Sequence, residues 1–244
     1  MAPTAATANS SSANADIIAL GGGGFSMEPD NLALDRHVLA LTGKPRPKIA
    51  FVPTASGDAD SYIQKFNAAF ATLDCEPSIL SLFKPAYSDL RDFVMAQDAI
   101  YVGGGNTYNM LALWRLHGLD VIFRDAWEAG VVLAGISAGA LCWFDAGPTD
   151  SFGPLRAIPC LGYLPGALCV HYDGEADRRP IFQRMIAEGS CPAGFAADDG
   201  AAIVFEGTDY AETVTSRPDA RSYRLVAVDG ATVETALPVR YIGP

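Results

Sequence analysis

Apolar runs typical of buried β-strands alternate with segments of helical periodicity over the first part of this chain. Strand-like runs lie at 16–20, 48–53, 77–82 and 99–102, and another begins at Val131. Between them, apolar residues recur every three or four positions at 32–41, 58–73, 110–116 and 121–129. Strands that alternate with helices of this length are typical of a parallel sheet covered on both faces. The pattern therefore predicts an α/β fold with three layers, α/β/α, around a mostly parallel sheet.

The pattern changes after about residue 147. The segment 147–165 is rich in Gly and Pro and predicts a loop, whereas 167–170 predicts a strand and 177–188 a helix. The chain shows no internal repeat and no clear linker, so residues 16–244 are predicted to form one domain. Short strands joined by polar turns are expected at 201–205, 223–229 and 232–236.

Residues 1–15 differ from the rest because they are rich in Ala, Ser, Thr and Asn. They lack the basic start and the apolar centre of a signal peptide. We therefore expect a disordered tail.

The composition narrows the class of protein. The 244 residues carry a formal net charge of −11, from 28 acidic and 17 basic residues. No cluster of Lys or Arg interrupts this excess of acid, which argues against nucleic acid or an anionic membrane as a partner. No apolar run reaches the roughly 18 residues of a membrane-spanning helix, so a soluble protein is expected. The five cysteines form no CxxC pair and are odd in number, which predicts buried thiols and a reducing, cytoplasmic location.

The run that begins at Val131 ends abruptly in Gly-Ile-Ser-Ala-Gly, with Ser137 at its centre. Glycines on either side of a serine permit the sharp strand-to-helix turn of a nucleophile elbow, which exposes the hydroxyl above a sheet. The first amide of the following helix, that of Ala138, would then face an oxyanion formed at the serine. Because the motif follows an apolar strand directly, it predicts a catalytic serine rather than a structural turn.

A serine nucleophile needs a general base, and the chain has three histidines. His37 lies within the first predicted helix, and His117 ends another before Gly118, so a structural role is sufficient for both. His171 instead follows the apolar run 167–170 and precedes a polar stretch, where a strand of an open α/β sheet delivers functional residues. The pattern therefore favours His171 as the base.

The third member of a serine triad is a carboxylate that holds the imidazole in the right tautomer. Asp198 and Asp199 follow the apolar run 194–197 and so come at a predicted strand end, but spacing alone leaves several acids open. The acids in segments that could approach the histidine are Asp145, Asp150, Asp173, Glu175, Asp198 and Asp199.

Short motifs for this chemistry are spread over much of the chain. They are Tyr101-Val102-Gly103-Gly104-Gly105-Asn106-Thr107, Gly135-Ile136-Ser137-Ala138-Gly139-Ala140, Thr149-Asp150-Ser151, His171-Tyr172-Asp173 and Asp198-Asp199-Gly200. Together they resemble the peptidase E family of serine peptidases, which includes aspartyl dipeptidase and, more distantly, cyanophycinase. The resemblance runs from Ile17 to about Phe205. It implies a class I glutamine amidotransferase-like fold, with serine where the amidotransferases have cysteine.

By position, the resemblance makes Ser137 the nucleophile and His171 the base. It places Asp199 where the family has an acidic residue, often glutamate, and so favours it over Asp198. Asp150 stays an alternative because it lies in the Thr-Asp-Ser motif.

The resemblance also implies roles for backbone and loop residues. The oxyanion hole would combine the Ala138 N–H with that of Gly104 or Gly105, and Asn106 would bind substrate. Glycines suit such a loop because they let the backbone approach a substrate carbonyl closely. The earlier run Gly21–Gly24 lacks the spacing of a dinucleotide-binding loop, and the resemblance implies a loop at the rim of the active site.

For the substrate, the resemblance implies short peptides with an N-terminal aspartate, cleaved without a metal or other cofactor. A cation would have to bind the aspartate carboxylate, and Arg178 and Arg179 at the start of a predicted helix are the candidates. The alternative for both is a solvated helix face. Val170 departs from the proline that many relatives have before the histidine. A homodimer is expected from the resemblance only.

Two other classes of protein would use these residues differently. Another hydrolase on the same scaffold, cyanophycinase-like or an esterase, would keep the triad and accept other acyl groups. A non-catalytic binding protein would tolerate loss of Ser137 or His171, and this chain retains both.

Overall fold

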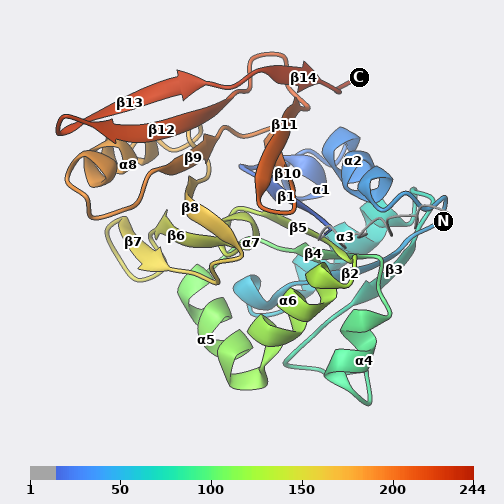
Figure 1. The fold of residues 1–244 in the computed structure, drawn as a ribbon. Coiled ribbons are helices and arrows are strands. Elements are labelled where there is room, and N and C mark those ends of the chain that lie inside the picture. The colour runs from blue at the N-terminus through green and yellow to red at the C-terminus, as the bar shows by residue number, and fades with distance from the viewer. Residues whose placement is uncertain (1–14) are drawn as a thin grey trace, which may run out of the picture.

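The computed structural model describes residues 15–244, which form two β-sheets with helices packed around them (Figure 1). The larger sheet has eight strands, and five of them run parallel next to one another. In spatial order these five are β1 (Asp16–Leu20), β5 (Val132–Ile136), β4 (Ala99–Val102), β2 (Lys48–Val52) and β3 (Glu76–Ile79). The predicted parallel core is confirmed.

Three C-terminal strands extend the larger sheet on the other side of β1. β10 (Ala201–Glu206) pairs antiparallel with β1, and β11 (Asp209–Thr215) pairs antiparallel with β10. The short β14 (Val239–Tyr241) then lies parallel to β11 at the edge. The prediction of β10 is confirmed, whereas β11 and β14 were not predicted.

The second sheet has six strands, in the order β13-β12-β9-β8-β6-β7. The loop predicted for 147–165 is wrong, because β6 and β7 pair antiparallel there and β6 pairs parallel with β8. Only the β6–β7 turn and the connection 160–163 are irregular. Pairing among these consecutive strands overrides the local Gly and Pro content. The strands are β6 (Phe144–Thr149), β7 (Arg156–Pro159), β8 (Leu164–Cys169), β9 (Gly194–Ala197), β12 (Ser222–Val228) and β13 (Ala231–Ala236).

Alternate residues of the parallel strands fill two separate cores, one on each face of the larger sheet. Side chains such as Ile18 and Phe51 pack under α1 (Gly24–Met27), α2 (Ala33–Leu41) and α3 (Asp60–Phe70). Ile17 and Val52 point to the opposite face, where another set of helices packs. These are α4 (Leu90–Met95), α5 (Thr107–His117), α6 (Leu119–Glu128) and the short α7 (Ala138–Leu141). The result is the predicted three-layer α/β/α arrangement.

Two smaller elements complete the fold. The 3₁₀ helix η1 (Thr54–Ser56) follows β2, and α8 (Arg178–Ala187) packs on strands β12 and β13 of the second sheet. The predicted tail lies outside the described residues except for Ala15, which hydrogen-bonds Trp127. All five cysteines are buried free thiols. Within residues 15–244, no helix combines the length and the apolar character needed to cross a bilayer.

Candidate active site

Ser137 lies in the sharp turn between β5 and α7. Its φ of 57° and ψ of −118° fall in a region that non-glycine residues rarely adopt. The flanking glycines explain how the turn is held, since a Cβ at Gly135 would overlap the Gly139 carbonyl and one at Gly139 would overlap Val102. The turn therefore has the nucleophile-elbow geometry that the sequence predicts, and the serine is partly exposed.

The end of β1 and the two residues after it hold three segments together. Leu20 O accepts the Ser137 N–H at 3.1 Å, and Gly21 O accepts the His171 N–H at 3.2 Å. Gly22 O then accepts the Gly200 N–H at 3.0 Å. Successive carbonyls of one short segment thus fix the serine turn, the histidine and the loop that carries Asp199.

His171 and Asp199 form a direct pair, with Nδ1 and Oδ1 2.6 Å apart. Their side chains are only 15% and 11% exposed, so the hydrogen bond is largely shielded from water. A Cβ at Gly22 would overlap Asp199 Oδ1 and lie 3.0 Å from His171 Nδ1. The carboxylate can therefore reach the imidazole only because position 22 is glycine.

Two further residues define the position of the Asp199 carboxylate. Asp173 Oδ1 accepts the Asp199 N–H at 2.8 Å. A Cβ at Gly174 would overlap Asp199 Oδ2, so the carboxylate lies between Gly22 and Gly174. Neither glycine contact could be predicted from the sequence, because Gly22 and Gly174 lie 177 and 25 positions before Asp199 and no local pattern links them to it.

The competing acids bond elsewhere. Asp198 Oδ2 accepts the Arg221 N–H at 2.9 Å, and burial together with the nearby charge of Asp173 raises the pKa of Asp198 to about 6. Asp150 is exposed and lies 3.7 Å from Arg178. Of the three acids that the resemblance left open, Asp199 alone contacts the histidine ring among the described residues.

The loop Gly103–Gly105 passes over Ser137. A Cβ at Gly104 would lie 3.1 Å from Ser137 Cβ and 3.6 Å from Ser137 Oγ. The Gly104 N–H donates to Tyr62 Oη at 3.2 Å, so the protein already uses it. The amides of Gly105 and Ala138 have no acceptor among the described residues. Tyr62 was predicted only as an apolar position of a helix, and nothing in its spacing indicated this contact.

Asn106 connects the glycine loop to the second sheet. Its Oδ1 accepts the Asn109 N–H at 2.8 Å and so caps α5, and its Nδ2 donates to Ser151 O at 2.7 Å. Both polar atoms of this predicted substrate-binding side chain therefore bond to the protein itself.

The two arginines predicted to bind substrate are paired with acids of the chain. Arg178 is buried, donates to Glu175 at 2.6 Å and to Pro148 O at 3.1 Å, and lies near Asp150. Arg179 forms an ion pair with Glu234 and lies over the rings of two tyrosines.

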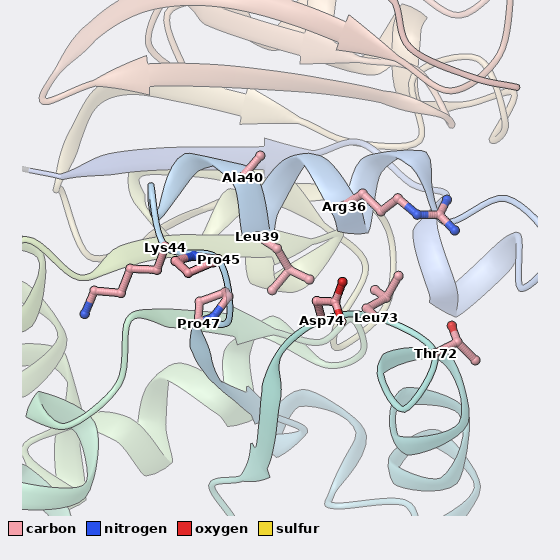
Figure 2. Close-up of a pocket in the computed structure, with 9 residues that line it drawn as sticks. All are labelled: Arg36, Leu39, Ala40, Lys44, Pro45, Pro47, Thr72, Leu73 and Asp74. Atoms are coloured by element: carbon pink, nitrogen blue, oxygen red, sulfur yellow. The ribbon is translucent and has the colours of Figure 1, made fainter.

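Three hollows on the surface lie at different places relative to the candidate residues. One lies among the ends of α2 and α3 and the start of β2, and contains none of the candidate residues (Figure 2). Two others, of about 540 and 470 Å³, lie on either side of Asn109 in the first turn of α5. The second of these is lined by Ala55, whose carbonyl accepts the Asn106 N–H at 2.7 Å. In the described part of the chain, no three His, Cys, Asp or Glu side chains converge to hold a metal ion.

The fold and the serine turn define an α/β hydrolytic scaffold, and comparison with known proteins gives the family. The model of peptidase family S51 matches residues 17–213, so the chain belongs to this family. It is a serine-type peptidase family, and the resemblance to peptidase E is confirmed.

Individual relatives agree. The chain is 56% identical to the uncharacterized peptidase YgaJ of Bacillus subtilis (strain 168), over 93% of this chain and 99% of that protein. It is 26% identical to peptidase E of Shewanella denitrificans, over 66% of this chain and 72% of that protein.

Solved structures share the fold. A peptidase from an acI-B1 actinobacterium superposes with a TM-score of 0.69 at 19% identity, covering 93% of this chain and 95% of that one. A peptidase E protein from Listeria monocytogenes EGD-e gives 0.59 at 19% identity, covering 82% of this chain and 98% of that one.

Proposed function

We propose that this peptidase is a serine exopeptidase that hydrolyses short peptides, with α-aspartyl dipeptides as the preferred class. Ser137 is the nucleophile, His171 the base and Asp199 the acid that orients the imidazole. The observation that supports this assignment best is the 2.6 Å bond between His171 and Asp199, made beside the carbonyls that hold the Ser137 turn. A buried His–Asp hydrogen bond is also the contact by which the acid of a serine triad orients its base.

In this mechanism the Ser137 hydroxyl attacks the peptide carbonyl and His171 accepts its proton through Nε2. The bond from Nδ1 to Asp199 keeps Nε2 free to accept, and stabilises the imidazolium that forms. His171 then protonates the leaving amine, and water hydrolyses the acyl-enzyme by the reverse sequence. No step uses a cofactor.

Charge that develops on the carbonyl oxygen needs hydrogen-bond donors. Of the two glycines that the sequence left open, Gly105 is the better candidate, because the Gly104 N–H already donates to Tyr62. We therefore assign the oxyanion hole to the amides of Gly105 and Ala138, which have no acceptor among the described residues. Each such donor contributes roughly 10²- to 10³-fold to the rate in serine peptidases.

The preference for N-terminal aspartate is supported by the likeness to proteins named peptidase E. Such a preference needs a cation for the aspartate carboxylate. The two guanidinium groups first considered, those of Arg178 and Arg179, already pair with acids. Aspartate binding by either would require one of these ion pairs to open.

The test is hydrolysis of Asp-Leu, Ala-Leu and N-blocked Asp-Leu by the wild type, Ser137→Ala and a control, Ser190→Ala, whose serine is exposed and bonds only Met185 O. We expect cleavage of free Asp-Leu, lost by at least about 10³-fold in Ser137→Ala and kept in the control. Cleavage of all three substrates would retain the serine mechanism and refute the aspartate preference.

Labelling with a fluorophosphonate separates the remaining alternatives. Labelling that depends on Ser137 without peptide hydrolysis would indicate an esterase or another acyl substrate. Absence of both labelling and hydrolysis would favour a binding protein.

A further inference from the structure

A hollow of about 540 Å³ lies between the β6–β7 turn and the first turn of α5. It is lined mainly by aromatic and polar side chains, among them Tyr108, Asn109, Ser151, Phe152 and Arg156. Two hydrogen bonds fix its walls to each other: Asn106 Nδ2 to Ser151 O at 2.7 Å, and Tyr108 N–H to Ser151 Oγ at 3.3 Å. The hollow is thus built from two elements that the protein holds together. Figure 1 shows β6 and β7 beside one end of α5.

Arg156 is preorganised within this hollow. Its guanidinium carbon lies 3.5 Å from the centre of the Phe152 ring, and the edge of Tyr108 packs against the same ring at 4.8 Å between centres. Stacking uses the flat face of a guanidinium and leaves its N–H groups directed outward in the plane. Those N–H groups are the ones that bind a carboxylate in bidentate fashion.

Arg156 also differs from the other arginines near the site in its partners. Arg178, Arg179 and Arg217 each form an ion pair with a carboxylate of the chain. The backbone of Arg156 belongs to the β6–β7 pair, but its side chain makes no ion pair and no hydrogen bond within residues 15–244 and contacts the Phe152 ring. Acidic residues outnumber basic ones in this chain, whose net charge is −11, yet no carboxylate in the described part of the chain pairs with Arg156. Its guanidinium group, which faces the hollow, is therefore available to bind an acidic ligand.

The position of the hollow relates this cation to the proposed reaction. Asn106, which fixes the turn through Ser151, directly follows Gly105, the oxyanion donor assigned above. A peptide with its scissile carbonyl at Gly105 and Ala138 would thus lie beside the loop that leads into α5, and the first turn of α5 lines this hollow. Asn109 on its wall adds an exposed amide that can bind a peptide group.

We propose that Arg156 and the hollow around it bind a carboxylate of the peptide substrate. The proposal rests on the proposed peptidase function and names a cation that binds a carboxylate of its substrate. The carboxylate has two sources in a short peptide, the C-terminus and an aspartate side chain. Either carboxylate would be bound by the guanidinium N–H groups of Arg156. Phe152 and Tyr108 would cover the apolar part of the substrate residue that carries the carboxylate.

Direct binding tests the proposal without relying on hydrolysis. In Ser137→Ala protein, calorimetry measures the affinity for Asp-Leu against Asp-Leu amide, which lacks the C-terminal carboxylate, and against Asn-Leu, which lacks the side-chain carboxylate. Arg156→Gln is added to this background, with Arg184→Gln as the control, since Arg184 is also exposed and forms no ion pair in the described chain. The readout is two affinity ratios: Asp-Leu over Asp-Leu amide, and Asp-Leu over Asn-Leu.

We expect Arg156→Gln to lower the ratio for one of the two pairs by about 10-fold or more, the usual effect of a charge-assisted bidentate contact. Arg156→Lys should keep part of the ratio, because it retains the charge and loses the fork and the stack. Arg184→Gln should leave both ratios unchanged. The pair that responds identifies the source of the carboxylate.

Unchanged ratios in Arg156→Gln, or no measurable binding of any peptide, would overturn the proposal. Fluorophosphonate labelling of wild type and Arg156→Gln keeps this result separate from the proposed function. A serine that labels normally in both proteins, together with unchanged ratios, refutes the carboxylate site alone. A serine that fails to label in the wild type refutes the peptidase mechanism.

Discussion

The two halves of the candidate site are built in different ways. The Ser137 turn is made almost entirely by its own neighbours, since Gly135 and Gly139 pack against each other and against the adjacent β4. His171 and Asp199 come from segments 28 residues apart, each following a strand of the second sheet, and both depend on glycines that follow β1. The nucleophile is thus encoded locally, whereas its base is placed by contacts across the whole chain.

This difference assigns a shared function to the first glycine run. Leu20 and Gly21 accept hydrogen bonds from Ser137 and His171 at adjacent carbonyls, so one strand end sets the separation of nucleophile and base. Gly22 completes the arrangement by leaving room for Asp199. Catalytic geometry that depends on such a template should fail when the template changes, even with all three triad residues present.

The largest expected effect comes from Asp199→Asn. An amide at this position donates to His171 Nδ1, which leaves the proton on Nε2 and removes its capacity to accept from Ser137. We expect kcat to fall by about 10³- to 10⁴-fold with little change in KM. Steady-state hydrolysis of the best dipeptide measures this.

Asp198→Asn is the matched control for Asp199→Asn. Its side chain bonds the Arg221 amide rather than the histidine, and an asparagine carbonyl can accept the same bond. Activity should stay within a few-fold of wild type. The reverse ranking of the two variants would assign the orienting role to Asp198.

A smaller but still large effect is expected from Gly22→Ala. The new Cβ would overlap Asp199 Oδ1, so the carboxylate or the strand end must move. Displacement of a catalytic group by about 1 Å costs on the order of 10²-fold in rate. We expect kcat to fall by that amount while the Ser137 turn remains folded.

Gly189→Ala controls for general destabilisation in this experiment. Gly189 has a φ of 72° with open space around it, so alanine there strains the backbone and touches nothing. It should lower the melting temperature and keep full activity per folded molecule. Equal activity of Gly22→Ala and wild type would show that β1 does not position the triad.

The same contrast explains which features could be predicted from the sequence. The serine turn follows from a five-residue motif after an apolar strand, and most of the parallel strands follow from hydrophobic runs that are buried in the structure. His171 could be chosen because it follows a strand. Asp199 could be preferred only through the family resemblance, because its neighbour Asp198 also comes directly after the strand at 194–197.

Other features depended on pairing partners that the local sequence does not indicate. β6 and β7 contain Pro148 and Pro159, which locally disfavour strands. Pro159 lies in β7, an edge strand where proline is tolerated, whereas β6 is held between β7 and β8. The pairing of Arg179 with Glu234 joins residues 55 positions apart. In the sequence Arg179 is an arginine at the start of a helix with no indicated partner. In the structure Glu234 of the C-terminal hairpin β12–β13 forms an ion pair with it.

A third, smaller effect concerns Asp35, a buried acid in α2. Asp35 is fully buried below Gly24, where its Oδ2 accepts the Phe25 N–H at 2.8 Å. Its Oδ1 and the nearby Tyr101 Oη are both buried without a well-aligned hydrogen bond within residues 15–244. Burial raises the pKa of Asp35 from its ordinary 3.8 to about 7.

Because the folded protein keeps a proton on Asp35 that the unfolded chain releases, this residue lowers stability as pH rises from about 4 to 7. Asp35→Asn mimics the protonated form and should remove that dependence. Chemical denaturation at several pH values should show wild type and variant similar near pH 4. The wild type should be less stable above pH 7, by about 4 kcal/mol at most. Asp30→Asn, at an exposed position nearby, should show no such divergence. A difference between wild type and Asp35→Asn that stays constant with pH would mean that Asp35 is ionised throughout, balanced by an interaction not seen among its neighbours.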